Sequence, residues 1–264
     1  MFEEKTKVLI ISGIMSPMHD WRQVNLMLRQ TLEASGHFLV KICEEFRGMT
    51  EEALRGYDLV LMNYDGMTKF PRGSSTPPPA IPLSENAEAA LCSFVRSGHG
   101  IMLFHSAVMP QQSFTPTYRE LVGSWGAEGR YKPYRDTGYT VDVLPGHPIT
   151  EGMEPHWDLC DDDFFNWVEL VPDAQVLATI HDPANERETP VAWCRSYGAG
   201  RVFSCSLGHQ QDTLRRLDFC RLLIRGCDWA AHGTVTVPMP DRDADDNWMR
   251  SWPWYYTSPL GRDY

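Results

Sequence analysis

The chain has 264 residues, of which 42% are hydrophobic, and carries a formal net charge of -11. A chain of this length and apolar content can bury a large core, which excludes an intrinsically disordered protein. The acidic balance disfavours partners that require a basic surface, so we expect neither nucleic acid nor an anionic membrane as a partner.

The 7 cysteines are odd in number and show no CxxC spacing. This usage favours reduced thiols in a cytoplasmic protein over a disulfide framework. The opening segment MFEEKTKVLIISG lacks the features of a signal peptide, and no apolar run approaches the length of a membrane span. We therefore expect a cytoplasmic location.

The first half of the chain alternates between strand and helix patterns. A β-branched run at residues 8–12 predicts a buried strand, and residues 23–34 have apolar side chains at helical spacing. Residues 38–42 and 57–63 predict two further strands, and a Pro-, Gly- and Ser-rich loop covers residues 66–84. This alternation predicts a mostly parallel sheet with helices on its faces.

The second half continues the α/β pattern. Ser84 is a candidate N-cap for a helix that runs to about residue 97, and an apolar strand then ends at His105. Residues 117–123 suit a short helix, residues 139–144 and 176–180 suit strands, and a Gly-bearing turn joins 190–195 to 202–206 as a hairpin. Residues 214–231 predict the last long helix.

Residues 234–264 differ in composition, being rich in Pro and Asp and then in aromatic residues. We expect one domain over residues 1–233 and an aromatic-rich tail, residues 234–264, packed on its surface. A cover over the functional site and a contact with a second subunit are the two alternatives for this tail.

Polar side chains follow two of the predicted strands. His105 and Ser106 come directly after an apolar strand, and His209 comes shortly after a second one. Ligands of open α/β sheets bind beyond the carboxyl ends of the strands. The sequence therefore predicts a working site built around His105 and His209.

Several segments between Lys7 and Ala231 stand in a characteristic order: VLIISG followed by HDW, then YDLVLMNY, GHGIMLFHSA, YRELVGSWG, GHPITEGM, DDDFF, PDAQVLA, TPVAWCRSYGAGRVFSCSLGH and LLIRGCDWAA. In this order they resemble the trehalose-utilisation (ThuA-like) family. The resemblance implies an α/β three-layer sandwich with a mostly parallel sheet, of the class I glutamine amidotransferase-like (flavodoxin-like) type. It also implies a role in carbohydrate metabolism.

The resemblance further implies specific positions for the two histidines. His105 takes the place of the cysteine nucleophile of the amidotransferases, and His209 matches their catalytic histidine. A histidine cannot form the thioester that glutamine hydrolysis requires, so we expect no glutaminase activity. The DDDFF segment departs from a DELY-like family motif, with Asp in place of Glu and Phe165 in place of Tyr.

Two chemistries are compatible with the groups expected to converge. His19, His105, Asp162 and His209 could hold one divalent metal (Zn, Mn or Ni) with an open position. Alternatively, His105, His209 and Asp163 could act as general acid and base without a metal. His19 lies on a loop, where a solvated histidine is an equally good interpretation.

The expected substrate-binding residues are Trp21, Tyr64, Ser106, Arg130 and Tyr131. Family members often carry a histidine shortly after the segment matched by LVGSWG, whereas AEGRYKPYRDTG stands here. Arg130 and Tyr131 in this stretch could bind sugar hydroxyls or a carboxylate instead. No nucleotide cofactor is expected.

The leading hypothesis is an enzyme that acts on a 3-keto sugar or glycoside by hydrolysis, elimination or isomerisation. A carbonyl acidifies the neighbouring C–H, so a positioned base and an electrophile on the oxygen suffice for this chemistry. The alternative is a non-catalytic sugar-binding or scaffold protein, because a fold does not fix a function. Homo-oligomerisation is left open.

Overall fold

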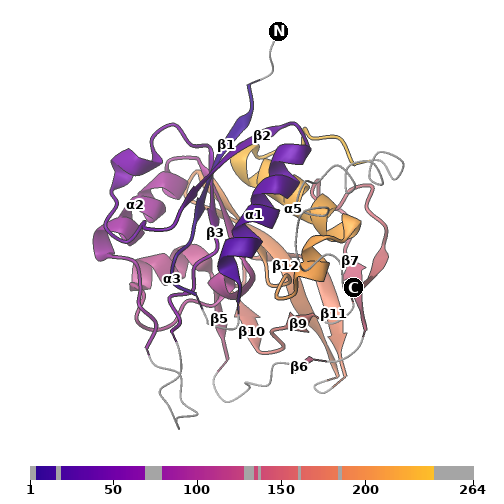
Figure 1. Ribbon diagram of the computed structural model, residues 1–264. Helices are drawn as coiled ribbons and strands as arrows, with labels where there is room; N and C mark the ends of the chain where they lie inside the picture. Colours follow the sequence, from indigo (N-terminus) through magenta and orange to yellow (C-terminus); the bar gives the residue numbers. More distant parts are fainter. Residues whose placement is uncertain are drawn as a thin grey trace.

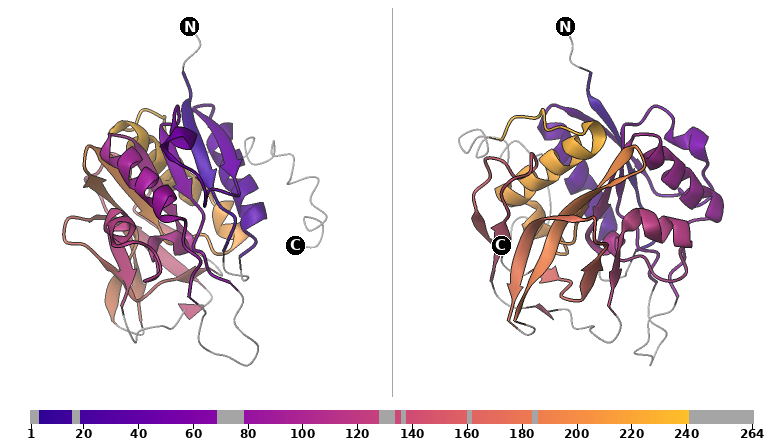
Figure 2. Two further views of the ribbon diagram at one scale, coloured as in Figure 1. Left: turned by 90° about the vertical axis from the view of Figure 1, so that its left-hand side faces the viewer. Right: turned by 180° about the vertical axis from the view of Figure 1, so that it is seen from behind.

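A nine-stranded sheet separates two layers of helices (Figure 1). The computed structural model describes residues 4–15, 19–68, 79–127, 134–135, 138–159, 162–183 and 186–240. Figure 2 shows the same layers from the side and from behind. The mixed α/β class with a large sheet confirms the predicted fold.

One half of the sheet is parallel. Its five strands, in spatial order, are β2 (Phe38–Cys43), β1 (Thr6–Ile11), β3 (Leu59–Met62), β4 (Gly100–Phe104) and β13 (Gly200–Cys205). Every residue of β3 and β4 is buried. Such continuous apolar strands are typical of a sheet covered on both faces, and they bring their carboxyl ends to one edge.

The other half of the sheet is antiparallel. It continues from β13 through β12 (Arg187–Tyr197), β11 (Gln175–Asp182), β7 (Tyr139–Val143) and β8 (His156–Leu159). The predicted hairpin is confirmed, with Tyr197 of β12 paired to Gly200 of β13. Two small sheets lie apart from the main one: β5 (Ser124–Gly126) with β10 (Val168–Leu170), and β6 (Tyr134–Arg135) with β9 (Asp163–Phe164).

The helices divide between two hydrophobic cores. Apolar residues of α1 (Trp21–Ala34) and α5 (Leu217–His232) pack on one face of the sheet. Those of α2 (Glu85–Arg96) and α3 (Pro116–Val122) pack on the other. Short helical turns are η1 (Glu51–Leu54), η2 (His105–Val108) and α4 (Gln211–Leu214).

The helix ends follow their capping residues. The Ser84 side chain accepts the Ala87 backbone N–H, which confirms the predicted start of α2. The single helix predicted over residues 214–231 is wrong at its beginning. The chain is extended at Arg216, so α4 ends at Leu214 and α5 begins at Leu217.

The segment after α5 runs back along that helix. The Asp228 carboxylate accepts the backbone N–H groups of Thr236 and Val237, and Arg221 donates to the Pro240 carbonyl at 2.7 Å. Residues 241–264 of the predicted tail lie outside the described residues. None of the helices in the described ranges has the length and apolar character needed to cross a membrane.

Gly200 begins β13 at a point where two backbone segments press against it. A β-carbon here would overlap the carbonyl oxygens of Val95 and His99. We expect Gly200→Ala to lower the free energy of unfolding by about 1–3 kcal/mol, the usual cost of overpacking. Urea denaturation measures this loss. Gly48→Ala is the matched control, because nothing lies within 4 Å of a β-carbon there; equal stability of the two variants would contradict the account.

Candidate metal centre

His105 stands at the turn that follows β4. Its φ of 48° lies in the left-handed region, which costs a non-glycine residue about 1–2 kcal/mol. The ring is fixed on two sides: Nδ1 donates to the Ser206 carbonyl at 2.8 Å, and Phe165 stacks on the ring at a centroid distance of 4.9 Å. A strained turn with an anchored side chain is typical of a functional position.

His209 lies on the loop between β13 and α4. Gly208 precedes it with a φ of 101°, and a β-carbon at Gly208 would overlap the ring of Phe104. The Asp162 carboxylate accepts the N–H of Gly208 at 2.9 Å and that of Gln210 at 3.0 Å. The residues on both sides of His209 are therefore tied to Asp162.

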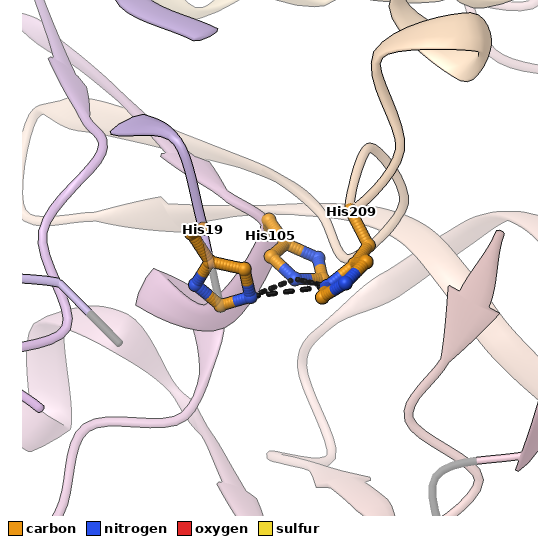
Figure 3. Close-up of side chains that lie close together, drawn as sticks. All are labelled: His19, His105 and His209. Carbon is orange, nitrogen blue, oxygen red and sulfur yellow. Dashed lines mark hydrogen bonds between the residues drawn. The ribbon is translucent and has the colours of Figure 1, made fainter. Parts of the chain in front are cut away.

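His19 enters from the segment that precedes α1, where Asp20 caps the helix. Its Nε2 lies 3.1 Å from His105 Nε2 and 3.1 Å from His209 Nδ1. His209 Nδ1 and His105 Nε2 are 3.3 Å apart, so three ring nitrogens form a nearly equilateral triangle (Figure 3). The three ring pairs are T-shaped, with interplanar angles of 81°, 75° and 65°.

The spacing of these nitrogens suits a shared metal ion. Tetrahedral ligation at a zinc–nitrogen distance of about 2.0–2.1 Å requires nitrogens about 3.3 Å apart. Because His105 Nδ1 donates to a carbonyl, its Nε2 presents a lone pair to the other two rings. Within the described part of the chain, His19, His105 and His209 form the group whose ligand atoms lie close enough to hold an ion.

Burial keeps His105 in the neutral form that a metal ligand needs. Loss of solvation and, to a smaller extent, the neighbouring His209 lower the pKa of His105 to about 3, although the hydrogen bond to Ser206 opposes the change. The imidazole is therefore uncharged at neutral pH, with its lone pair available.

Two carboxylates lie beside the triangle. Asp163 is 6% exposed, and its Oδ1 lies 3.2 Å from His209 Nδ1. Asp65 Oδ2 lies 3.8 Å from His19 Nδ1 and accepts the Ser106 hydroxyl at 2.7 Å. A carboxylate beside the nitrogen that does not bind the metal commonly orients a metal-bound histidine, and Asp65 lies in this position at His19. Asp163 instead lies beside the candidate ligand nitrogen of His209.

Asp162 faces a different set of groups from its neighbour Asp163. Its two oxygens accept three backbone N–H groups, those of Gly208, Gln210 and Asp163. Burial raises the pKa of Asp162 to about 6, while the bonds from Gly208 and Gln210 oppose this rise. The structure thus places the carboxylate against the His209 loop rather than among the three ring nitrogens.

The predicted substrate-binding residues are spread over several environments. Ser106 is buried against Asp65. The Tyr64 hydroxyl donates to the Ile81 carbonyl, and burial raises the pKa of Tyr64 to about 12. Trp21 begins α1 with the Arg22 guanidinium 3.9 Å above its ring. Arg130 and Tyr131 lie outside the described residues.

Sequence reasoning missed two groups at this site. Asp65 follows β3 at the edge where His105 follows β4, so the rule that found His105 could also have found Asp65. The other is the Ser206 carbonyl that orients His105. As a backbone group it leaves no signal in the side-chain pattern.

By its fold, the protein belongs to the class of glutamine amidotransferase-like α/β proteins, and it has a histidine on the turn after β4. The family model for ThuA, described as trehalose utilisation, matches residues 7–230, and the chain belongs to this family. Membership implies a carbohydrate-related role.

Solved structures show the same fold. A ThuA-like protein from Parabacteroides merdae is 23% identical with a TM-score of 0.72, covering 90% of this chain and 94% of that one. A ThuA-like protein from Bacteroides uniformis is 16% identical with a TM-score of 0.67, covering 89% and 96%. A β-galactosidase from Rahnella sp. R3 is 16% identical with a TM-score of 0.58, and the match covers 90% of this chain but 32% of the enzyme. No curated protein matches the sequence significantly.

Proposed function

We propose that this protein is a metal-assisted enzyme of carbohydrate metabolism that acts on a 3-keto sugar or glycoside. The observation that carries the proposal is the convergence of the His19, His105 and His209 ring nitrogens within 3.1–3.3 Å of one another. Family membership supports a carbohydrate as the substrate, and the position beyond the parallel strands is where α/β sheets bind ligands.

The three histidines would hold one divalent ion through His19 Nε2, His105 Nε2 and His209 Nδ1. Imidazole ligands suit Zn and Ni, and Mn is the third candidate. When bound, such an ion supplies Lewis-acid polarisation of a sugar oxygen. A catalytic ion held by three protein ligands commonly keeps a further position for water or substrate, and this ion would do the same.

Asp163 is the proposed general base. With His105 and His209 engaged as ligands, a different group must move the proton, and the Asp163 carboxylate lies 3.2 Å from His209 Nδ1. A ketone acidifies the C–H beside it, so a nearby carboxylate can remove that proton and return it at a neighbouring position or to a leaving group. Elimination, hydrolysis by way of elimination, and isomerisation share this first step.

The proposal includes five substrate-binding residues. We assign the sugar hydroxyls to Trp21, Tyr64, Ser106, Arg130 and Tyr131, as the sequence predicts. Ser106 is the best supported of these, because it adjoins His105 and its hydroxyl is oriented by Asp65. No nucleotide cofactor enters the proposal.

Glutamine hydrolysis forms no part of the proposal. Burial raises the pKa of the Cys92 thiol to about 11 and that of Cys205 to about 12, so neither provides a thiolate near neutral pH. His105 stands where the amidotransferases have their nucleophilic cysteine. The replacement of this cysteine by histidine also favours the alternative function, a sugar-binding or scaffold protein without turnover.

The experiment that tests the proposal compares two sugars. Protein loaded separately with Zn, Mn or Ni is incubated with a 3-keto-glucoside or with the same glucoside in unoxidised form, and NMR follows the products. We expect turnover of the keto compound alone. A thermal shift without turnover would favour the binding protein, and no response to either sugar would contradict the substrate class.

A further inference from the structure

Asp162 connects two segments that meet at the histidine cluster. It directly precedes β9, is 1% exposed, and lies 46 residues before the loop that it contacts. Oδ2 accepts the Gly208 N–H at 2.9 Å, and Oδ1 accepts the N–H groups of Gln210 at 3.0 Å and Asp163 at 3.1 Å. One buried carboxylate thus binds three backbone donors.

These donors surround the groups on which the proposed chemistry depends. Gly208 and Gln210 are the two neighbours of His209, so their bonds fix the loop on both sides of the imidazole. Gln210 is also the N-cap of α4 and makes no side-chain capping bond. Instead, the Asp162 carboxylate, which belongs to a distant part of the sequence, accepts the backbone N–H of Gln210. The third donor belongs to Asp163, so the same side chain also fixes the proposed base.

The hydrogen bonds account for the orientation of the carboxylate. Each oxygen points at a backbone N–H, and bonds from N–H groups to a buried carboxylate are among the stronger hydrogen bonds in proteins. Turning an oxygen toward the three ring nitrogens would leave a buried N–H of Gly208 or Gln210 without its acceptor. In the described part of the chain, the ligand atoms that can share an ion come from the three histidines.

We propose that Asp162 is a positioning residue of the metal centre: it fixes the His209 loop and Asp163 relative to each other and does not bind the metal. This role differs from the ligand role that the sequence suggests. The positioning role rests on the proposed function, because the residues that Asp162 positions are a proposed metal ligand and the proposed base. The hydrogen bonds themselves exist without a metal.

The first test uses the metal-free protein. Amide hydrogen exchange followed by NMR should show slow exchange at Gly208 and Gln210. Asp162→Asn should speed it by at least about tenfold, because the new NH₂ group cannot accept from one of these donors. Asp163→Asn is the matched control, since it changes the neighbouring buried carboxylate and should leave both amides protected. Equal exchange in the two variants would overturn the proposal.

The second test measures metal binding. Asp162→Asn should still bind about one Co²⁺ per chain at saturation, with affinity reduced by about 10–100-fold and a shifted visible absorption band. Retention of wild-type affinity and spectrum would overturn the positioning role. If the wild-type protein binds no metal, the proposed function fails, and the exchange experiment still decides whether Asp162 holds the loop.

A structure of the metal-loaded wild-type protein covers the case in which Asp162→Asn does not fold. We expect Asp162 to keep its bonds to Gly208 and Gln210. An Asp162 oxygen at about 2.0–2.2 Å from the metal, the usual zinc–carboxylate distance, would overturn the proposal.

Discussion

Replacing His209 with alanine should abolish stoichiometric metal binding and lower kcat/KM for a 3-keto-glycoside by about 10³-fold or more. A loss of this size equals about 4 kcal/mol of transition-state stabilisation. The physical reason is that His209 Nδ1 lies 3.1 Å from His19 Nε2 and 3.3 Å from His105 Nε2, so its removal leaves two ligands. His19→Ala and His105→Ala should have effects of the same order.

Two exposed histidines provide controls. His156 and His181 each bond to a carboxylate, Asp142 at 2.6 Å and Glu188 at 2.9 Å, and neither belongs to the group that could hold an ion. His181→Ala should retain wild-type metal content and kcat/KM. Metal content by mass spectrometry and steady-state kinetics measure both quantities. Full metal content in His209→Ala would contradict the assignment of this residue as a ligand.

Acidification of the metal-free protein from pH 7 to pH 4 should lower its free energy of unfolding, with His105 responsible for about 1–3 kcal/mol of the loss. Burial lowers the pKa of His105 to about 3 in the folded chain, whereas an unfolded histidine binds a proton near pH 6.5. Above about pH 6.5 the contribution of His105 is fully present. As the pH falls toward 3, only the unfolded state gains the proton, so stability is lost across this window.

His105→Asn isolates this effect. Asparagine tolerates the left-handed backbone at this position, where φ is 48°, and does not titrate. Urea denaturation at several pH values with a chelator present should give the variant a shallower loss of stability than the wild type. The raised pKa of Asp162 acts in both proteins and cancels in the comparison. Identical pH dependence would show that His105 gains a proton in the folded state as readily as in the unfolded one.

Much of the fold follows from local sequence patterns. The apolar run of β4, the Ser84 cap of α2 and the glycine-bearing turn between β12 and β13 each carry a local physical signal, and the structure has all three. The antiparallel half is harder to predict, since the side-chain patterns of β7 and β11 are compatible with either strand direction. The break at Arg216 also lacks a signal, because apolar spacing continues through it.

Prediction of the candidate site has a different limit. His105 and His209 could be found because polar residues after buried strands collect at one edge of a sheet. The place of His19 depends on the path of the loop before α1, which side-chain pattern does not determine. Asp162 and Asp163 are adjacent aspartates, and the sequence pattern does not distinguish them. The backbone of the His209 loop does, because Asp162 accepts N–H groups of this loop and Asp163 lies beside the imidazole.

The most direct test of the metal centre is a crystal structure of the metal-loaded protein with anomalous data collected at the absorption edge of the metal. We predict one anomalous peak about 2.0–2.2 Å from His19 Nε2, His105 Nε2 and His209 Nδ1. A peak bound elsewhere, or no peak with the three rings turned apart, would contradict the account.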